Sequence, residues 1–286
     1  MTQEEIVFLK KKAVERRIDI INMIFKAKSG HTGGSLSAVE ILVVLFYKIM
    51  RIDPKNPKWE DRDRFVLSKG HSAEVYYSIL ADLGFFPKKE LENYCKYGSM
   101  LTGHPTTKVP GVEVNTGALG HGLAVGIGMA IAGKMDKKNY KVYVLMGDGE
   151  LDEGSVWEAA QIAAHYQLDN LIGIVDRNRL QITGDTEEVL KLENLVDKWA
   201  AFGWQVIQVD GHNIEELVQT FKEIPLVDKK PHLVIARTIK GKGISFIEGD
   251  KSWHHRVPSD EEYKRALAEL RQQLREVVRH VEEGSL

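Results

Sequence analysis

The sequence has few of the features that direct a chain to a membrane, to nucleic acid or out of the cell. Its 286 residues contain a single cysteine, Cys95, which excludes a disulfide within the chain. The formal net charge of −2 provides no excess of basic residues for nucleic acid or anionic lipid. The longest apolar run, residues 41–47, is too short to span a bilayer, and the charged residues 1–17 do not resemble a signal peptide. We therefore expect a cytoplasmic protein with no membrane or nucleic-acid partner, and Cys95 as a buried core residue.

The pattern of apolar residues predicts an α/β fold, a doubly wound, mostly parallel sheet with helices on both faces. Short apolar runs predict strands at 64–67, 140–146, 171–175, 204–209 and 232–238. Helical spacing predicts helices at 6–28, 38–49, 73–83, 123–132, 156–166 and 214–221, and a last helix from 261 with a capping box of Ser259 and Glu262. The glycine-rich segment 29–35 is expected to break the first helix, and 100–122 to form a long loop. We predict one domain over 1–258 and a helical extension over 259–286.

Short polar turns follow two of the predicted strands. The sequence Gly-Asp-Gly at 147–149 comes directly after strand 140–146, and Asp-Arg-Asn at 176–178 comes after strand 171–175. Strand ends of this kind form the ligand crevice of parallel sheets. Asp148 offers a carboxylate oxygen and Asn178 an amide oxygen, which with a backbone carbonyl and ligand phosphates would suit Mg²⁺. Gly149 would allow a diphosphate to approach the backbone closely. A Gly-Asp-Gly sequence by itself is also compatible with an ordinary turn.

Four histidines follow a glycine in predicted breaks, and a fifth lies near the C-terminal helix. They are His31, His71, His104, His121 and His254. A single histidine of this kind is most often a surface or capping residue. Metal binding is possible, but no pair has the spacing of a helical zinc site. Proton transfer and hydrogen bonding to sugar hydroxyls or phosphate are the better interpretation, because the pKa of histidine lies near neutral pH.

The combination and order of these motifs resemble transketolase. The segments that carry the resemblance are 28–37 (KSGHTGGSLS), 63–71 (DRFVLSKGH), 102–105 (TGHP), 110–120 (PGVEVNTGALG) and 147–158 (GDGELDEGSVWE). The resemblance covers residues 1–260 and the N-terminal, diphosphate-binding half of the family. It implies the thiamine-diphosphate-binding fold and a thiamine diphosphate cofactor with Mg²⁺, for which Ca²⁺ is the alternative ion.

The resemblance also implies a role for individual residues. The metal ligands would be Asp148, Asn178 and the backbone carbonyl of Leu180. The cofactor contacts would be His71, Gly117, Leu119, Gly149, Glu153, Asn178 and His254. The catalytic residues, which would contact donor hydroxyls and move protons, would be His31, His71, His104 and His254. Glu153 and Glu158 also match a buried acidic cluster at the family's subunit interface, although carboxylates at a helix N-terminus would have the same sequence pattern.

The sequence departs from the family pattern at one position and in one short stretch. Position 121 is histidine where the family usually has glutamine. The stretch 255–258, which begins with His255 and Arg256, stands where the family has small residues beginning with glycine. Arg256 is either a phosphate ligand or a solvated surface residue.

The family has a second half, which holds the cofactor's aminopyrimidine and grips the sugar phosphate, and these 286 residues do not contain it. We interpret the chain as a natural half that acts with a separate C-terminal transketolase subunit, two copies of each forming a heterotetramer. The expected reaction transfers a two-carbon ketol unit between a ketose phosphate and an aldose phosphate in the pentose phosphate pathway. The alternatives are a subunit of a 2-oxoacid dehydrogenase or synthase, and a non-catalytic regulatory half.

Overall fold

Five parallel strands form the central sheet, in the order β1-β2-β3-β5-β4. The computed structural model describes residues 1–283. The strands are β1 (Arg64–Leu67), β2 (Val142–Gly147), β3 (Leu171–Arg177), β4 (Gln205–Asp210) and β5 (His232–Arg237). Every residue of β2 and β3 is buried, as expected for central strands of a parallel sheet that is covered on both faces. Their continuous apolar runs are the reason that the sequence predicted them.

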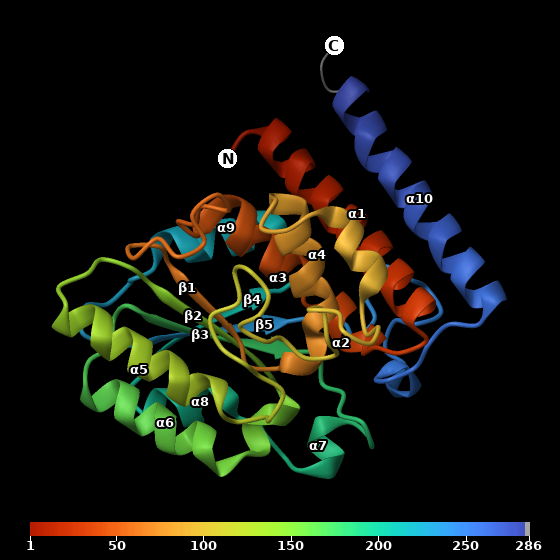
Figure 1. Ribbon diagram of the computed structural model, residues 1–286. Helices are drawn as coiled ribbons and strands as arrows, with labels where there is room; N and C mark the ends of the chain where they lie inside the picture. The colour runs from red at the N-terminus through yellow and green to blue at the C-terminus, as the bar shows by residue number, and fades with distance from the viewer. Residues whose placement is uncertain (284–286) are drawn as a thin grey trace.

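Helices cover both faces of the sheet, as Figure 1 shows. One face carries α1 (Gln3–Ala27), α3 (Val39–Val44), α4 (Ala73–Leu83) and α9 (Ile214–Glu223). The other carries α5 (Gly122–Met135), α6 (Gly154–His165) and α8 (Leu195–Ala201). The predicted doubly wound α/β fold is therefore confirmed. Shorter elements are α2 (Thr32–Ser37), α7 (Thr186–Val189), a π-helix (Leu45–Ile49) and 3₁₀ helices at Gly70–Ser72, Lys88–Asn93, Gly149–Asp152 and Lys251–Trp253.

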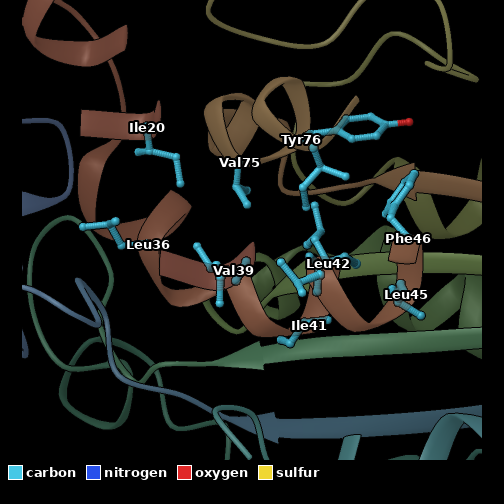
Figure 2. Packing of buried hydrophobic residues seen from close by; sticks show 14 of the residues in the cluster. Ile20, Leu36, Val39, Ile41, Leu42, Leu45, Phe46, Val75 and Tyr76 are labelled. Atoms are coloured by element: carbon cyan, nitrogen blue, oxygen red, sulfur yellow. The ribbon is translucent and has the colours of Figure 1, made fainter. Parts of the chain in front are cut away.

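The larger core cluster surrounds α3, which is buried along its whole length. Figure 2 shows Ile41, Leu42 and Leu45 packed between the sheet and the helices above it. Phe46 contacts Phe65 of β1 edge to face, with ring centroids 5.1 Å apart. Burying one such side chain stabilises the fold by roughly 1.5–3 kcal/mol. This cluster anchors the N-terminal third of the chain to the sheet and so positions the turn that follows α1.

One helix was not predicted, and one sequence expectation was wrong. The segment 29–35 does end α1, but α2 begins inside it at Thr32, and all six residues of α2 are buried. Packing therefore overrides the low helix propensity of Gly33 and Gly34. Cys95 is exposed rather than buried, in a left-handed conformation with φ of 56°. Residues 100–122 do form a long loop, which contains no helix or strand before α5 begins at Gly122.

The C-terminal helix α10 (Asp260–Glu283) lies along α1 (Figure 1). The ring of Tyr263 stacks on Phe25 at 3.9 Å, and its hydroxyl donates to Asn22 at 2.8 Å. Ser259 and Glu262 form the predicted capping box. The predicted boundary at 258 stays a prediction, and residues 284–286 of the extension lie outside the described residues. Within residues 1–283, every helix is too short or too polar to cross a membrane.

Candidate active site

A cavity of about 410 Å³ opens at the carboxyl ends of the parallel strands. The register explains the convergence, because Gly147 at the end of β2 pairs with Asp176 of β3, which in turn pairs with Ala236 of β5. Two groups of residues line the cavity. Those predicted from the sequence are His31, His71, Gly117, Leu119, Asp148, Gly149, Asn178, Leu180 and His254, and those not predicted include Lys69, Glu150, Gln181, Ile182 and Lys240.

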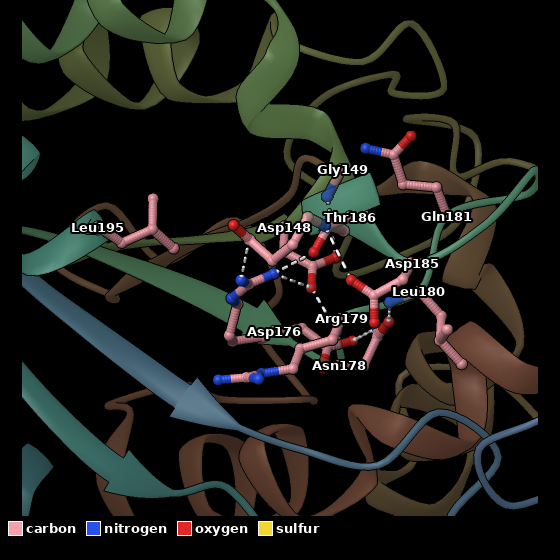
Figure 3. Close-up of polar contacts among 12 residues, drawn as sticks. Asp148, Gly149, Asp176, Asn178, Arg179, Leu180, Gln181, Asp185, Thr186 and Leu195 are labelled. Atoms are coloured by element: carbon pink, nitrogen blue, oxygen red, sulfur yellow. Dashed lines mark hydrogen bonds and ion pairs between the residues drawn. The ribbon is translucent and has the colours of Figure 1, made fainter. Parts of the chain in front are cut away.

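Asp148 is 2% exposed and stands directly after β2. One carboxylate oxygen accepts from the backbone N–H of Gly149 at 2.8 Å, and the other accepts from the N–H of Arg179 at 2.6 Å and from Arg177 at 3.2 Å. Figure 3 shows this carboxylate beside Asn178 and Leu180. Burial, and then repulsion from Asp176, raise the pKa of Asp148 to about 6. A cation at this position would stabilise the ionised form.

Asn178 and Leu180 supply two further oxygens. The amide nitrogen of Asn178 donates to Asp176 at 3.3 Å, and its amide oxygen accepts from the N–H of Leu180 at 3.1 Å. The carbonyl of Leu180 accepts from Lys240 at 2.8 Å. Carboxylate, amide and carbonyl oxygens are hard donors and fit Mg²⁺ or Ca²⁺. Among residues 1–283, no group of three or more His, Cys, Asp or Glu side chains is arranged to hold a metal, so an ion here would depend on such oxygens and on ligand phosphates.

Asp176 is a structural centre that the sequence reasoning missed as a functional residue. It is fully buried and forms an ion pair with Lys69, itself 1% exposed. It also accepts from Ser37 at 2.6 Å and from the hydroxyl of Thr238. Burial alone would raise its pKa, but the charge of Lys69 and these hydrogen bonds outweigh it and lower the pKa. The sequence contained one indication that these residues belong to the site, because Lys69 and Asp176 both stand where a predicted strand ends.

Lys240 brings a second ammonium group into the cavity. Its Nζ lies 2.8 Å from the Leu180 carbonyl and 2.8 Å from Nδ1 of His254. Burial, and then the charge of Lys69, lower its pKa to about 8. The cavity floor therefore carries two lysines, of which Lys69 is already neutralised by Asp176. The ammonium group of Lys240 is therefore available to an anionic ligand such as a diphosphate, beside the carboxylate of Asp148 that would need a cation.

The imidazole rings cluster around His31. Ring centroids lie at 5.3 Å for His71, 5.9 Å for His104, 5.8 Å for His254 and 4.6 Å for His255. The four histidines that the sequence singled out as catalytic are thus brought together, although His104 is exposed and lies outside the cavity lining. His255 is an addition that the sequence reasoning did not assign to the site.

The inner rings are held neutral at pH 7. Burial, followed by repulsion from His255 and His104, lowers the pKa of His31 to about 4. Burial and the neighbouring Lys240 lower the pKa of His254 to about 3, and burial and Lys69 lower that of His71 well below its ordinary value. A neutral imidazole donates from one nitrogen and accepts at the other, which suits sugar hydroxyls. A bound diphosphate would raise these pKa values toward neutrality.

Glycine is required at one point of this lining. Gly117 has φ of 139°, and a Cβ there would lie 2.9 Å from the ring of His104. The long loop 100–122 therefore passes close to the histidine cluster, and Leu119 brings an apolar side chain to the same cavity.

Other predicted residues lie away from the cavity. Glu153 and Glu158 are exposed at the start of α6, which gives no support to a contact between Glu153 and the cofactor. His121 is exposed and its ring bonds to the Leu119 carbonyl at 3.0 Å. The guanidinium of Arg256 lies 4.2 Å from the ring centroid of Trp253 and pairs with Glu262 at 2.5 Å, so it is held at the surface.

Comparison with known proteins agrees with this geometry. Residues 9–274 match the family model described as transketolase, thiamine diphosphate binding domain. The chain belongs to the transketolase family. It is 52% identical over 260 residues to a protein of Phocaeicola vulgatus that is named as one subunit of an apulose-4-phosphate transketolase, covering 91% of this chain and 92% of that protein. It is 42% identical over 271 residues to the 6-deoxy-6-sulfo-D-fructose transketolase subunit SqwG of a Clostridium species, covering 94% and 98%.

Longer transketolases share the fold. The crystal structure of transketolase from Campylobacter jejuni matches this structure with a TM-score of 0.88 and 35% identity, over 94% of this chain and 43% of that one. The chain therefore spans less than half of that transketolase, but nearly the full length of the two relatives whose names mark them as subunits. The predicted family and fold are confirmed.

Proposed function

We propose that this chain is the cofactor-binding subunit of a two-chain transketolase, which transfers a two-carbon ketol unit between a ketose phosphate and an aldose phosphate. The observation that carries the proposal is the shared cavity. Oxygen donors at Asp148, Asn178 and Leu180 and the ammonium of Lys240 lie on its floor, and neutral histidines gathered around His31 stand beside them. Such a site can hold an anionic cofactor and a polyol next to each other.

The residues fit thiamine diphosphate with a divalent ion. Asp148, Asn178 and the Leu180 carbonyl would hold Mg²⁺, and the ion and Lys240 would together neutralise the diphosphate. Lys240 would then give up the Leu180 carbonyl, which it occupies at 2.8 Å. When bound, the cofactor supplies the thiazolium carbon to which the transferred unit becomes attached. The chain's own contribution is to bind and orient the diphosphate end.

The histidines would handle hydroxyls and protons. His31, His71 and His254 have depressed pKa values and would accept or donate hydrogen bonds to substrate hydroxyls as neutral rings. His31 is best placed to meet a hydroxyl, because its ring lines the cavity and lies at the centre of the cluster. His104 is exposed on the outer side of the cluster and would act on the arriving substrate rather than on the diphosphate.

A second chain would complete the site. Support comes from the length comparison, since relatives of similar length are named as subunits whereas the C. jejuni enzyme is more than twice as long. We infer two copies of each chain in a cytoplasmic heterotetramer, with the pyrimidine end of the cofactor bound by the partner. The relatives named above are transketolases, which favours ketol transfer over the 2-oxoacid and non-catalytic alternatives.

The sugar need not be a pentose phosphate. The relatives are named for apulose 4-phosphate and for 6-deoxy-6-sulfo-D-fructose, so a branched or sulfonated sugar is the specific alternative to xylulose 5-phosphate and ribose 5-phosphate.

Reconstitution tests the proposal. The chain would be assayed with thiamine diphosphate and Mg²⁺, alone and together with a candidate second chain that carries the pyrimidine-binding half of a transketolase. We expect ketol transfer only in the mixture. Pentose phosphates, apulose 4-phosphate and the sulfosugar would be compared as donors. Absence of transfer from every donor, in a mixture that forms a complex and binds the cofactor, would reject the proposal.

A further inference from the structure

His255 is the histidine nearest to His31 in the cluster. Their ring centroids lie 4.6 Å apart with an interplanar angle of 66°. His254, the preceding residue, contacts the same His31 ring at 5.8 Å but is half-buried and faces Lys240. His255 is exposed. The two consecutive histidines therefore meet His31 from different sides, His254 from the cavity and His255 from the solvent.

The backbone around His255 is held in place. The hydroxyl of Thr32 donates to the carbonyl of Arg256 at 2.6 Å, which ties this turn to the start of α2, next to His31. The side chain of Arg256 is engaged elsewhere, over Trp253 and with Glu262. The family pattern has small residues at 255 and 256, where this chain has a histidine and an arginine. Of these two side chains, only that of His255 therefore faces the cluster.

We propose that His255 is a specificity-determining residue, which hydrogen-bonds a substrate hydroxyl lying beyond the two-carbon unit that is transferred. This inference rests on the proposed function. The order of groups from the floor outward is Lys240, His254, His31 and His255. The transferred unit reacts next to the cofactor, so the more distant carbons of a sugar extend toward the outer ring. One hydroxyl at the exposed ring of His255 can lie within hydrogen-bonding distance of both rings, because their centroids are 4.6 Å apart.

Comparing long and short donor substrates distinguishes a specific role of His255 from a general loss of structure. In the reconstituted complex, His255→Gly should raise KM about five- to ten-fold for ketose phosphates, the effect of losing one hydrogen bond. The KM for hydroxypyruvate, a short ketol donor without a polyol chain, should stay within about two-fold, and so should the dissociation constant of the cofactor. His255→Gln retains a donor and an acceptor and should recover part of the loss. His165→Gly, at an exposed histidine on α6, is the matched control.

A second measurement does not depend on turnover. Diethylpyrocarbonate labels exposed imidazoles, and peptide mass spectrometry of the wild-type complex would give the labelling rate of His255 with and without ketose phosphate. We expect the sugar to protect His255 and to leave His165 unchanged. Equal labelling of His255, or an equal rise in KM for long and short donors, would overturn the inference. A wild-type complex without ketol transfer would instead reject the proposed function, and the labelling would still decide whether His255 meets a sugar.

Discussion

The backbone N–H of His31 donates a hydrogen bond of 2.8 Å to the buried carboxyl group of Glu74. The same carboxyl group accepts from the hydroxyl of Tyr94 at 2.7 Å and from that of Ser35 at 2.6 Å. Glu74 has no lysine, arginine or histidine partner among the ion pairs of the described residues. Its contacts thus fix the turn that carries the central imidazole of the cluster.

Removing this carboxyl group should therefore affect both stability and the site. Glu74→Ala leaves two buried hydroxyls and the part-buried N–H of His31 without an acceptor. It should lower the free energy of unfolding by at least about 3 kcal/mol, at roughly 1–3 kcal/mol for each unsatisfied group. Glu74→Gln keeps the shape and should lose less. Urea denaturation gives the stability, and donor KM reports the position of His31. Glu92→Ala, at an exposed glutamate nearby, is the control, and an equal loss in all three variants would contradict the assignment.

Asp148→Ala should weaken Mg²⁺-dependent binding of thiamine diphosphate by at least about tenfold, because a carboxylate is the strongest ligand in the oxygen set. The fold should persist, since Arg177 keeps its ion pairs with Glu187 and Glu193. Calorimetric titration with and without Mg²⁺ measures the effect, with Asp136→Ala, at an exposed aspartate after α5, as the control. Undiminished binding in the Asp148 variant would contradict the metal assignment.

His104→Ala should lower turnover and raise donor KM while leaving cofactor affinity nearly intact. The ring lies outside the cavity lining, and its backbone carbonyl stays bonded to the Tyr77 hydroxyl at 3.0 Å and the Thr102 hydroxyl at 2.8 Å, so the loop should keep its place. Steady-state kinetics in the reconstituted complex, with the cofactor dissociation constant measured in parallel, tests this. A large loss of cofactor affinity would move His104 to the diphosphate site.

Glu40 should contribute to resistance against acid. Burial would raise its pKa, but the charge of Arg17 and hydrogen bonds from His212 and Arg17 lower it from 4.5 to about 2. A lowered folded-state pKa stabilises the protein above pH 4.5, and the contribution disappears as pH falls from about 4.5 to about 2; 2.5 pH units correspond to about 3 kcal/mol.

The Glu40→Gln variant should therefore be less stable at pH 7 and should lose less stability between pH 4.5 and pH 2. Urea denaturation at pH 7, 4.5 and 3 measures both effects, and Glu215→Gln at the surface of α9 is the control. Parallel stability curves for wild type and Glu40→Gln in this range would show that Glu40 does not titrate as described.

The sequence predicted the sheet well because each central strand is a continuous apolar run that ends in a polar turn. It placed Asp148 and Asn178 at strand ends, and the structure brings both to one cavity. Lys69 and Lys240 were missed because lysine is rarely buried, and its burial here depends on Asp176 and on the Leu180 carbonyl, which are distant in sequence. The helix of Thr32–Ser37 was missed because tertiary burial, which local propensity does not report, stabilises its glycines.

Asp176 joins side chains from four separate segments: Ser37 in α2, Lys69 after β1, Asn178 after β3 and Thr238 after β5. These segments lose their conformational freedom when the chain folds, and little remains to be lost when a ligand arrives. The end of the cavity that we propose for the diphosphate is therefore preorganised within this chain. A partner chain would then need to order only the opposite, pyrimidine end of the cofactor.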